Sequence, residues 1–292
     1  MTLFLDALLT GLTLGGMYAL VALGLNLQYG VARILNLSYG EMLIAAAVLA
    51  YVLFGLQGLS PLVTLVLVLP LAALVGCAMY SLMLTPLVRR APNRNALEAD
   101  SLLGTFGLLF IVQGVMLVLV GGGYLSYSFL AEPVDVLGTT LAANRLLALG
   151  MAVVLGLAVW LLLTRTRVGT AIRAVSVDPV SAQLAAIDVT RLAMIAFALG
   201  TVLAMIAGVL LSMSMTFSAT MGMVFTMKAL IVIIMGGIGN MAGAVVAALM
   251  LGLVESFVAT FIDPALTLAA SYALFLLVLL LKPAGLFGKA SR

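Results

Sequence analysis

LAMIAFALGTVLAMIAGVLL, the stretch at residues 192–211, contains twenty consecutive residues without a charged side chain. A helix needs about 20 apolar residues to cross the hydrocarbon core of a bilayer, so this stretch predicts a membrane-spanning helix. Small residues recur in it at every fourth position, at Ala196, Gly200, Ala204 and Gly208. Positions four apart lie on one face of a helix, and small residues there let a second helix come close. We therefore expect this span to pack inside a bundle.

The rest of the chain follows the same pattern. Hydrophobic residues make up 65% of the 292 residues and charged residues only 8%, with a mean hydropathy of +1.34, whereas roughly a quarter of a soluble domain is charged. The composition predicts an all-α, polytopic transmembrane bundle of about eight to nine spans, forming a single domain over residues 1–292. Glycine pairs at Gly11/Gly15 and Gly239/Gly243 predict further helix packing. The apolar runs lie at 7–29, 42–59, 62–84, 102–121, 146–163, 192–211, 224–237, 241–262 and 266–281.

Basic residues lie on one side of these runs. Eleven of the 13 Lys and Arg residues fall in alternate loops or in the C-terminal tail. Because cytoplasmic loops carry an excess of Lys and Arg, residues 85–101, 164–191 and the C-terminus are predicted to be cytoplasmic. Counting back through nine runs places the N-terminus on the outer side. The eleven residues are Arg33, Arg89, Arg90, Arg94, Arg165, Arg167, Arg173, Arg191, Lys282, Lys289 and Arg292.

The composition excludes several kinds of site. Histidine is absent and Cys77 is the sole cysteine, so histidine catalysis, an intrachain disulfide and a thiolate metal cluster are all ruled out. The glycines at 237 and 239 resemble part of a dinucleotide-binding motif, but an apolar span follows them where a soluble βαβ unit is required. No phosphate-binding loop is present. We expect no enzyme activity, no metal, no cofactor and no nucleic-acid partner.

Two segments interrupt the helical pattern more strongly than ordinary turns. Residues 29–41 connect the first two apolar runs and contain several polar side chains, and residues 235–240 are rich in glycine. Interrupted helices in a membrane protein indicate a substrate path, because unwound backbone is tolerated only next to protein or water. Two ordinary turns are the alternative interpretation. The predicted path residues are Asn26, Asn36, Ser38 and Tyr39 near the first break, together with Glu255, a carboxylate within a span.

The segment 164–191 contains a short predicted helix. Asp178 before Pro179 is typical of an N-cap followed by proline at the first helical position, so residues 180–187 could form an amphipathic helix that ends near Asp188. Small residues at 182, 185 and 186 give this helix one flat face. It could bind a partner on the cytoplasmic side or lie on the membrane surface.

Several motifs, in order along nearly the whole chain, resemble the LivH-type permeases, which are the membrane subunits of ABC importers for branched-chain amino acids. Two positions differ from the family pattern. The family commonly has Asn-Phe/Leu-Ala-His-Gly where this chain has residues 36–40, and it usually has glycine where Ala186 stands. The motifs are GLTLGGMYALVALG (11–24), QYG (28–30), LNLSYGE (35–41), RVGTAIRA (167–174), GGIG (236–239) and KPAGLFG (282–288).

The resemblance implies a division of labour. This chain would form half of a translocation path in a bacterial inner membrane. A second, LivM-like permease would form the other half, two LivG/LivF-like ATPases would supply energy, and a periplasmic binding protein would deliver the amino acid. A permease for urea or short amides and an ion-coupled secondary transporter remain alternatives; a membrane enzyme ranks last. The residues expected to couple the chain to an ATPase are Arg173, Asp178, Ala182, Leu184, Ala186 and Asp188.

Overall fold

A computed structural model describes residues 2–136 and 139–288 of the chain, so Lys289 and Arg292 lie outside the described residues. Within that part, eight helices are long and apolar enough to cross a membrane, and a ninth apolar helix is shorter. The prediction of an all-α polytopic bundle is therefore confirmed. The helices are α1 (Thr2–Ala32), α2 (Tyr39–Gln57), α3 (Pro61–Ala78) continued by a π-helical turn (Met79–Leu84) and α4 (Thr85–Arg90), α5 (Arg94–Val120), α6 (Ala143–Arg165), α7 (Arg167–Val177), α8 (Pro179–Leu184), α9 (Val189–Ser214), α10 (Gly222–Gly236), α11 (Met241–Phe261), a 3₁₀ turn (Pro264–Leu266) and α12 (Thr267–Leu281).

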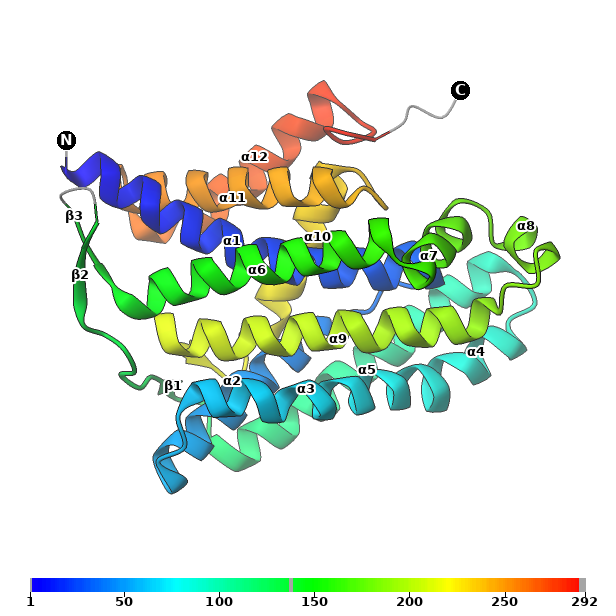
Figure 1. The fold of residues 1–292 in the computed structure, drawn as a ribbon, viewed down its shortest axis with the longest axis horizontal. Coiled ribbons are helices and arrows are strands. Elements are labelled where there is room, and N and C mark those ends of the chain that lie inside the picture. The colour runs from blue at the N-terminus through cyan, green and yellow to red at the C-terminus, as the bar shows by residue number, and fades with distance from the viewer. Residues whose placement is uncertain (1, 137–138, 289–292) are drawn as a thin grey trace.

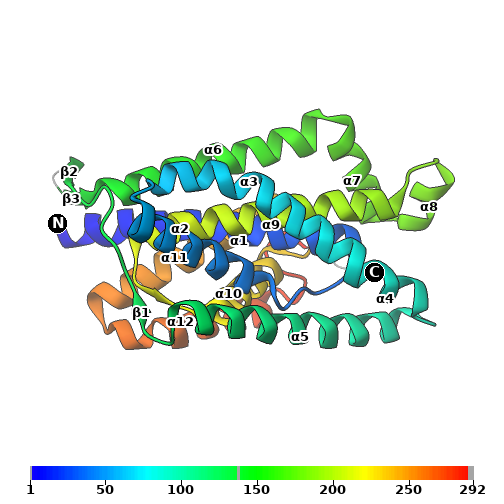
Figure 2. The same cartoon turned by 90° about the horizontal axis from the view of Figure 1, so that it is seen from below.

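Short strands cover the end of the bundle where the chain begins. β2 (Pro133–Val136) pairs with β3 (Thr139–Ala142), and β1 (Tyr124–Leu125) pairs with β4 (Phe217–Ser218), both antiparallel. The opposite end carries α4, α7, α8 and the C-terminal segment (Figure 1, Figure 2). The segments predicted to be cytoplasmic from their basic residues thus lie together at one end, which we call the α7–α8 end.

The core of the bundle is built around α1 and α9. Both helices are largely buried, and α1 packs against α9 and α11, while α9 also packs against α2 and α3. The outer helices α5, α6 and α12 have few buried positions. Apolar side chains on their outer faces would cost free energy in water, so those faces fit contact with lipid or with another membrane chain.

Small residues allow these close contacts. An added Cβ atom at Gly11 or Gly15 would lie 2.9 Å or 2.8 Å from a Cα atom of α11. On α9, Ala196 and Ala204 are fully buried, Gly200 packs against Gln28 and Gly208 against the backbone of Leu43. The two glycines of the second predicted pair, Gly239 and Gly243, have different roles. Gly243 packs against Gly236, whereas Gly239 has nothing within 4 Å of an added Cβ and adopts a φ of +81°, so it serves the turn.

Polar residues start several helices by accepting a hydrogen bond from a backbone amide of the first turn. Such N-caps satisfy amides that have no partner inside the helix. Asn93 caps α5, Thr166 caps α7, Asp178 caps α8, Asp188 caps α9 and Asn240 caps α11.

The apolar run at 224–237, predicted as a span, is only part of one. α10 has 15 residues, about 22 Å at 1.5 Å per residue, which is shorter than a hydrocarbon core of about 30 Å. It runs steeply across the neighbouring helices near the middle of the bundle (Figure 1). Residues 215–221 lead back from the end of α9 to the start of α10, so this crossing combines an extended segment and a half-length helix.

Candidate functional site

The two interrupted segments meet where α2 and α10 begin. After α1 ends at Ala32, residues 33–38 run without regular structure inside the bundle and lead into α2. The backbone N–H of Gly40 donates to Oγ1 of Thr226 at 2.8 Å, and Thr226 donates in turn to the carbonyl of Leu37 at 3.3 Å. An added Cβ on Gly40 would overlap the carbonyl of Gly222. We call this meeting point, Leu37–Glu41 with Gly222–Thr226, the half-helix junction.

A buried polar network supports the irregular segment just before the junction. Asn36 donates to Oε1 of Gln28 at 3.0 Å, and its own oxygen accepts from the backbone and the hydroxyl of Ser38. Gln28 donates to the carbonyl of Phe197 and to Thr201 on α9. Because unpaired backbone groups are costly away from water, these side chains replace the partners that a continuous helix would have provided.

The other predicted path residues of α1 and α2 also hold backbone in place. The Tyr39 hydroxyl is fully buried and donates to the carbonyl of Gly200 at 3.1 Å. Asn26 accepts from the amide of Gly239 at 2.9 Å, which fixes the glycine-rich break against α1. Asn26 therefore contacts the glycine-rich break, whereas the group formed by Asn36, Ser38 and Tyr39 contacts Gln28 and α9.

Glu255 belongs to a separate buried cluster. It forms an ion pair of 2.8 Å with Lys228, and it accepts from the hydroxyls of Tyr18 at 2.6 Å and Ser271 at 2.5 Å. Lys228 also donates to the Tyr18 oxygen at 2.7 Å. The cluster joins α1, α10, α11 and α12, and all its charges are paired, as intramembrane charges usually are.

Glu41 stands in contrast to Glu255. Its side chain is fully buried in the first turn of α2, and neither carboxylate oxygen has a hydrogen-bond donor in proper geometry among the described residues. The carboxylate lies directly against Gly222, at the start of α10, and faces the amide of Met223. Sequence reasoning placed Glu41 beside the break but did not select it, since the lack of a partner depends on tertiary structure.

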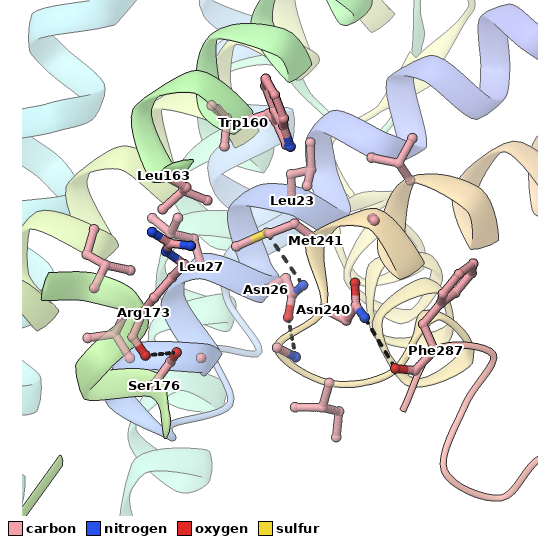
Figure 3. A pocket seen from close by; sticks show the side chains of 18 of the residues that line it. Leu23, Asn26, Leu27, Trp160, Leu163, Arg173, Ser176, Asn240, Met241 and Phe287 are labelled. Carbon is pink, nitrogen blue, oxygen red and sulfur yellow. Dashed lines mark hydrogen bonds between the residues drawn. The ribbon is translucent and has the colours of Figure 1, made fainter. Parts of the chain in front are cut away.

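A cavity of about 620 Å³ opens near the α7–α8 end between α1, α6, α7, the glycine-rich break and the C-terminal segment. Figure 3 shows aliphatic side chains such as Leu23, Leu27 and Leu163 on its wall, with Asn26 and Asn240 at the break. Arg33 and Arg173 line it as well, and its lining includes no acidic residue. Among the predicted path residues, Asn26 alone reaches this cavity.

The predicted coupling segment forms two short helices rather than one. α7 precedes α8, and α8 ends at Leu184 instead of extending to residue 187. The chain turns at Ala186, whose φ of +59° lies in the left-handed region, and Asp188 begins α9 by accepting from the amide of Arg191 at 3.0 Å. Left-handed backbone costs an L-residue roughly 1–2 kcal/mol and costs glycine much less. This geometry explains why glycine suits position 186.

The residues expected to dock a partner divide between two faces. Ala182 is buried in one apolar cluster with Ile172 and Val175 of α7, so it holds α8 against α7. Leu184 is 86% exposed and Arg173 is exposed beside the cavity. Asp178 caps α8 by accepting from the amide of Val180 at 2.9 Å, and it also accepts from the Ser181 hydroxyl. The hydrogen bond from the Ser181 hydroxyl, followed by those from the backbone amides, lowers the pKa of Asp178.

Three polar residues were missed from sequence. Gln28, Thr226 and Arg33 hold the junction and the segment before it, and the Arg33 guanidinium donates to the carbonyl of Ser176 on α7. Polar residues in otherwise apolar runs were a usable signal for Gln28 and Thr226. The partner of Arg33 lies 143 positions further along the chain, so no local sequence pattern indicates this contact.

Comparisons with known proteins agree on one family. The family model described as branched-chain amino acid transport system, permease component, matches residues 7–281. The high-affinity branched-chain amino acid transport system permease protein LivH of Escherichia coli K12 is 27% identical, covering 98% of this chain and 96% of that protein. LivH of Salmonella typhimurium LT2 is 26% identical and BraD of Pseudomonas aeruginosa 25%, with the same coverage.

One solved structure has a similar fold. A chain of PsaBC from Streptococcus pneumoniae in complex with Fab superimposes with a TM-score of 0.50 at 15% sequence identity, covering 97% of this chain and 94% of that chain. At this identity the similarity concerns the fold alone.

Proposed function

This chain belongs to the family of permease components of branched-chain amino acid transport systems, and on that basis we propose that it is the membrane subunit of an ATP-driven importer. It forms half of the translocation path for branched-chain, hydrophobic amino acids. A second, LivM-like permease forms the other half, and a periplasmic binding protein supplies the substrate. Two LivG/LivF-like ATPases hydrolyse ATP, so the chain itself is not an enzyme.

The observation that best supports an ATPase partner is the apolar surface of the coupling segment. Val177, Val180 and Leu184 are 82%, 68% and 86% exposed at the α7–α8 end, where flanking basic residues predict the cytoplasm. Apolar side chains gathered on a segment outside the membrane favour contact with another protein. In this orientation the N-terminus is periplasmic and the C-terminus cytoplasmic, within a bacterial inner membrane.

The structure offers a route from that surface to the half-helix junction. α8 rests on α7 through Ala182, and α7 is tied to Arg33 through the carbonyl of Ser176. Arg33 begins the irregular segment that enters the junction four residues later, at Leu37. Movement of a docked ATPase would thus displace α7, Arg33 and the start of α2 together, as in rigid-body switching.

Uptake by cells that depend on this chain tests the proposal. Leu184→Glu should abolish uptake of labelled leucine, isoleucine and valine and prevent co-purification of the ATPase, while the amount of the chain in the membrane stays unchanged. Leu266→Glu is the matched control, because Leu266 is 48% exposed between α11 and α12 at the opposite end of the bundle.

Other outcomes would identify the alternative functions. Uptake of urea or short amides instead of leucine would assign a different substrate within the same family. Uptake driven by an ion gradient, without ATP, in vesicles that contain only this chain would indicate a secondary transporter and contradict the proposal.

A further inference from the structure

We propose that the half-helix junction is a subsite for the charged groups of the transported amino acid, with Glu41 receiving the ammonium group and the first amides of α10 receiving the carboxylate. This inference rests on the proposed import function and specifies where the substrate is recognised within this chain. Four features of the junction support it: the carboxylate without a cationic partner, the first amides of α10, the glycine contact and the exposed edge.

The first feature is the state of Glu41. A carboxylate buried in a membrane protein is costly unless paired, and such residues usually mark a functional site. The chain can satisfy a buried carboxylate, because Glu255 has a lysine and two hydroxyl donors. Among the described residues, Glu41 has no cationic or side-chain donor in hydrogen-bond geometry although it is fully buried, and its carboxylate faces the backbone amide of Met223. Its negative charge is therefore not balanced by a cation and can pair with a cationic group.

The second feature is the start of α10. The first amides of a helix have no acceptor within the helix and carry partial positive charge. Val224 and Phe225 donate to the carbonyl of Met221, and Met221 offers no side-chain cap. The amides of Gly222 and Met223 precede these bonds, at the N-terminal end of α10. Half-length helices in transporters direct such N-termini at anionic substrate groups.

The third feature is the contact between the two groups. An added Cβ on Gly222 would overlap the Glu41 carboxylate, so only glycine at this position leaves room for it. Because the carboxylate faces the amide of Met223, Glu41 occupies the place that suits an anion. A substrate carboxylate would replace it at α10, and Glu41 would then turn to the substrate ammonium a few ångströms away.

The fourth feature is access. Met223 and Val224, on the same turn of α10, are 42% and 39% exposed. The junction therefore reaches a face of this chain, which the proposed second permease would complete as the wall of the path. The segments at 33–38 and 215–221 lead into α2 and α10, respectively, and can change conformation without breaking a helix.

The test uses the assembled importer. Glu41→Gln preserves the shape and removes the charge, and it should lower leucine uptake by on the order of tenfold or more, the effect of losing one strong ionic contact. Co-purification of the ATPase should remain, which shows that the variant folds and assembles. Glu132→Gln, the same substitution in an exposed loop, is the control and should transport normally. Normal uptake by Glu41→Gln would overturn the inference, and the proposed function would stand as long as the wild type imports leucine.

Carbodiimide labelling of the wild-type importer supplies a readout that does not depend on folding of a variant. A hydrophobic carbodiimide should label Glu41 during ATP turnover, and leucine should reduce the label at Glu41 while the fully paired Glu255 is unaffected. Labelling at Glu41 that leucine does not change, or an absence of label there in both conditions, would contradict the subsite. Failure of the wild type to import any amino acid would instead contradict the proposed function.

Discussion

The cluster around Glu255 allows a stringent test of whether an intramembrane charge serves transport or packing. Glu255 lies within α11, where a charge indicates a path residue by sequence alone, yet the structure pairs it with Lys228, Tyr18 and Ser271. If packing is its role, Glu255→Gln should destabilise the fold. Lys228 would then keep only the Tyr18 hydroxyl, and its charge would remain about 4.7 Å above the Tyr18 ring.

The magnitudes follow from the bonds that each variant loses. Removing one member of a buried ion pair costs about 3–5 kcal/mol, because the other charge stays buried without a counter-ion. Lys228→Met should lie near the lower end of that range, since Glu255 would keep the hydroxyls of Tyr18 and Ser271. Glu255→Gln should lie near the upper end. The double variant buries no net charge and should recover on the order of 3 kcal/mol relative to the sum of the single effects.

Thermal unfolding of the purified chain in detergent measures these differences. Each single variant should unfold on the order of 10 °C below the wild type, and the double variant should unfold no lower than Glu255→Gln alone, although it carries both substitutions. Additive losses in the double variant would refute the pairing argument. A normal unfolding temperature for Glu255→Gln combined with a loss of uptake would return Glu255 to the translocation path.

Three further predictions concern packing and backbone. Gly208→Ala should destabilise the chain by about 2 kcal/mol in the same unfolding assay, because the new methyl group overlaps the carbonyl of Leu43. Gly114→Ala on α5 is the control, because its new methyl group meets nothing within 4 Å. It should be neutral or up to about 1 kcal/mol stabilising. Ala186→Gly should relieve about 1 kcal/mol of backbone strain, because residue 186 adopts a φ of +59°. Proteolysis at the turn after α8 should then be slower in the variant, and faster cleavage would contradict the prediction. Tyr39→Phe should cost about 1 kcal/mol for the bond to Gly200 and leave uptake near normal; lost uptake with unchanged stability would make Tyr39 a path contact.

Hydropathy predicted most of the fold because length and composition decide whether a helix can cross a bilayer. The same measure failed for α10. Its composition matches that of a full span, but its 15 residues begin at the junction, after a segment that returns from the end of α9. The depth in the bundle at which a helix begins depends on which groups accept hydrogen bonds from its first amides. Hydropathy contains no information on these acceptors.

The coupling segment shows a similar limit on a smaller scale. The Asp178–Pro179 pair correctly placed the start of α8. Its end was misplaced because alanine is a good helix former, and the three alanines among residues 180–187 favoured a longer helix. The turn at Ala186 depends instead on Asp188 starting α9. The inward face of Ala182 depends on α7, a separate helix that sequence periodicity did not resolve.

Polar residues near the breaks were chosen from sequence because irregular backbone in a membrane indicates function. The structure divides them by whether they have partners. Asn36, Ser38 and Tyr39 hydrogen-bond to the chain itself, and so do the missed Gln28 and Thr226. These residues satisfy the backbone that the break exposes, which every broken span requires whatever it transports. Among the described residues, Glu41 has no cationic or side-chain partner. Burying its charge costs free energy, and for this reason we propose that a ligand supplies the partner.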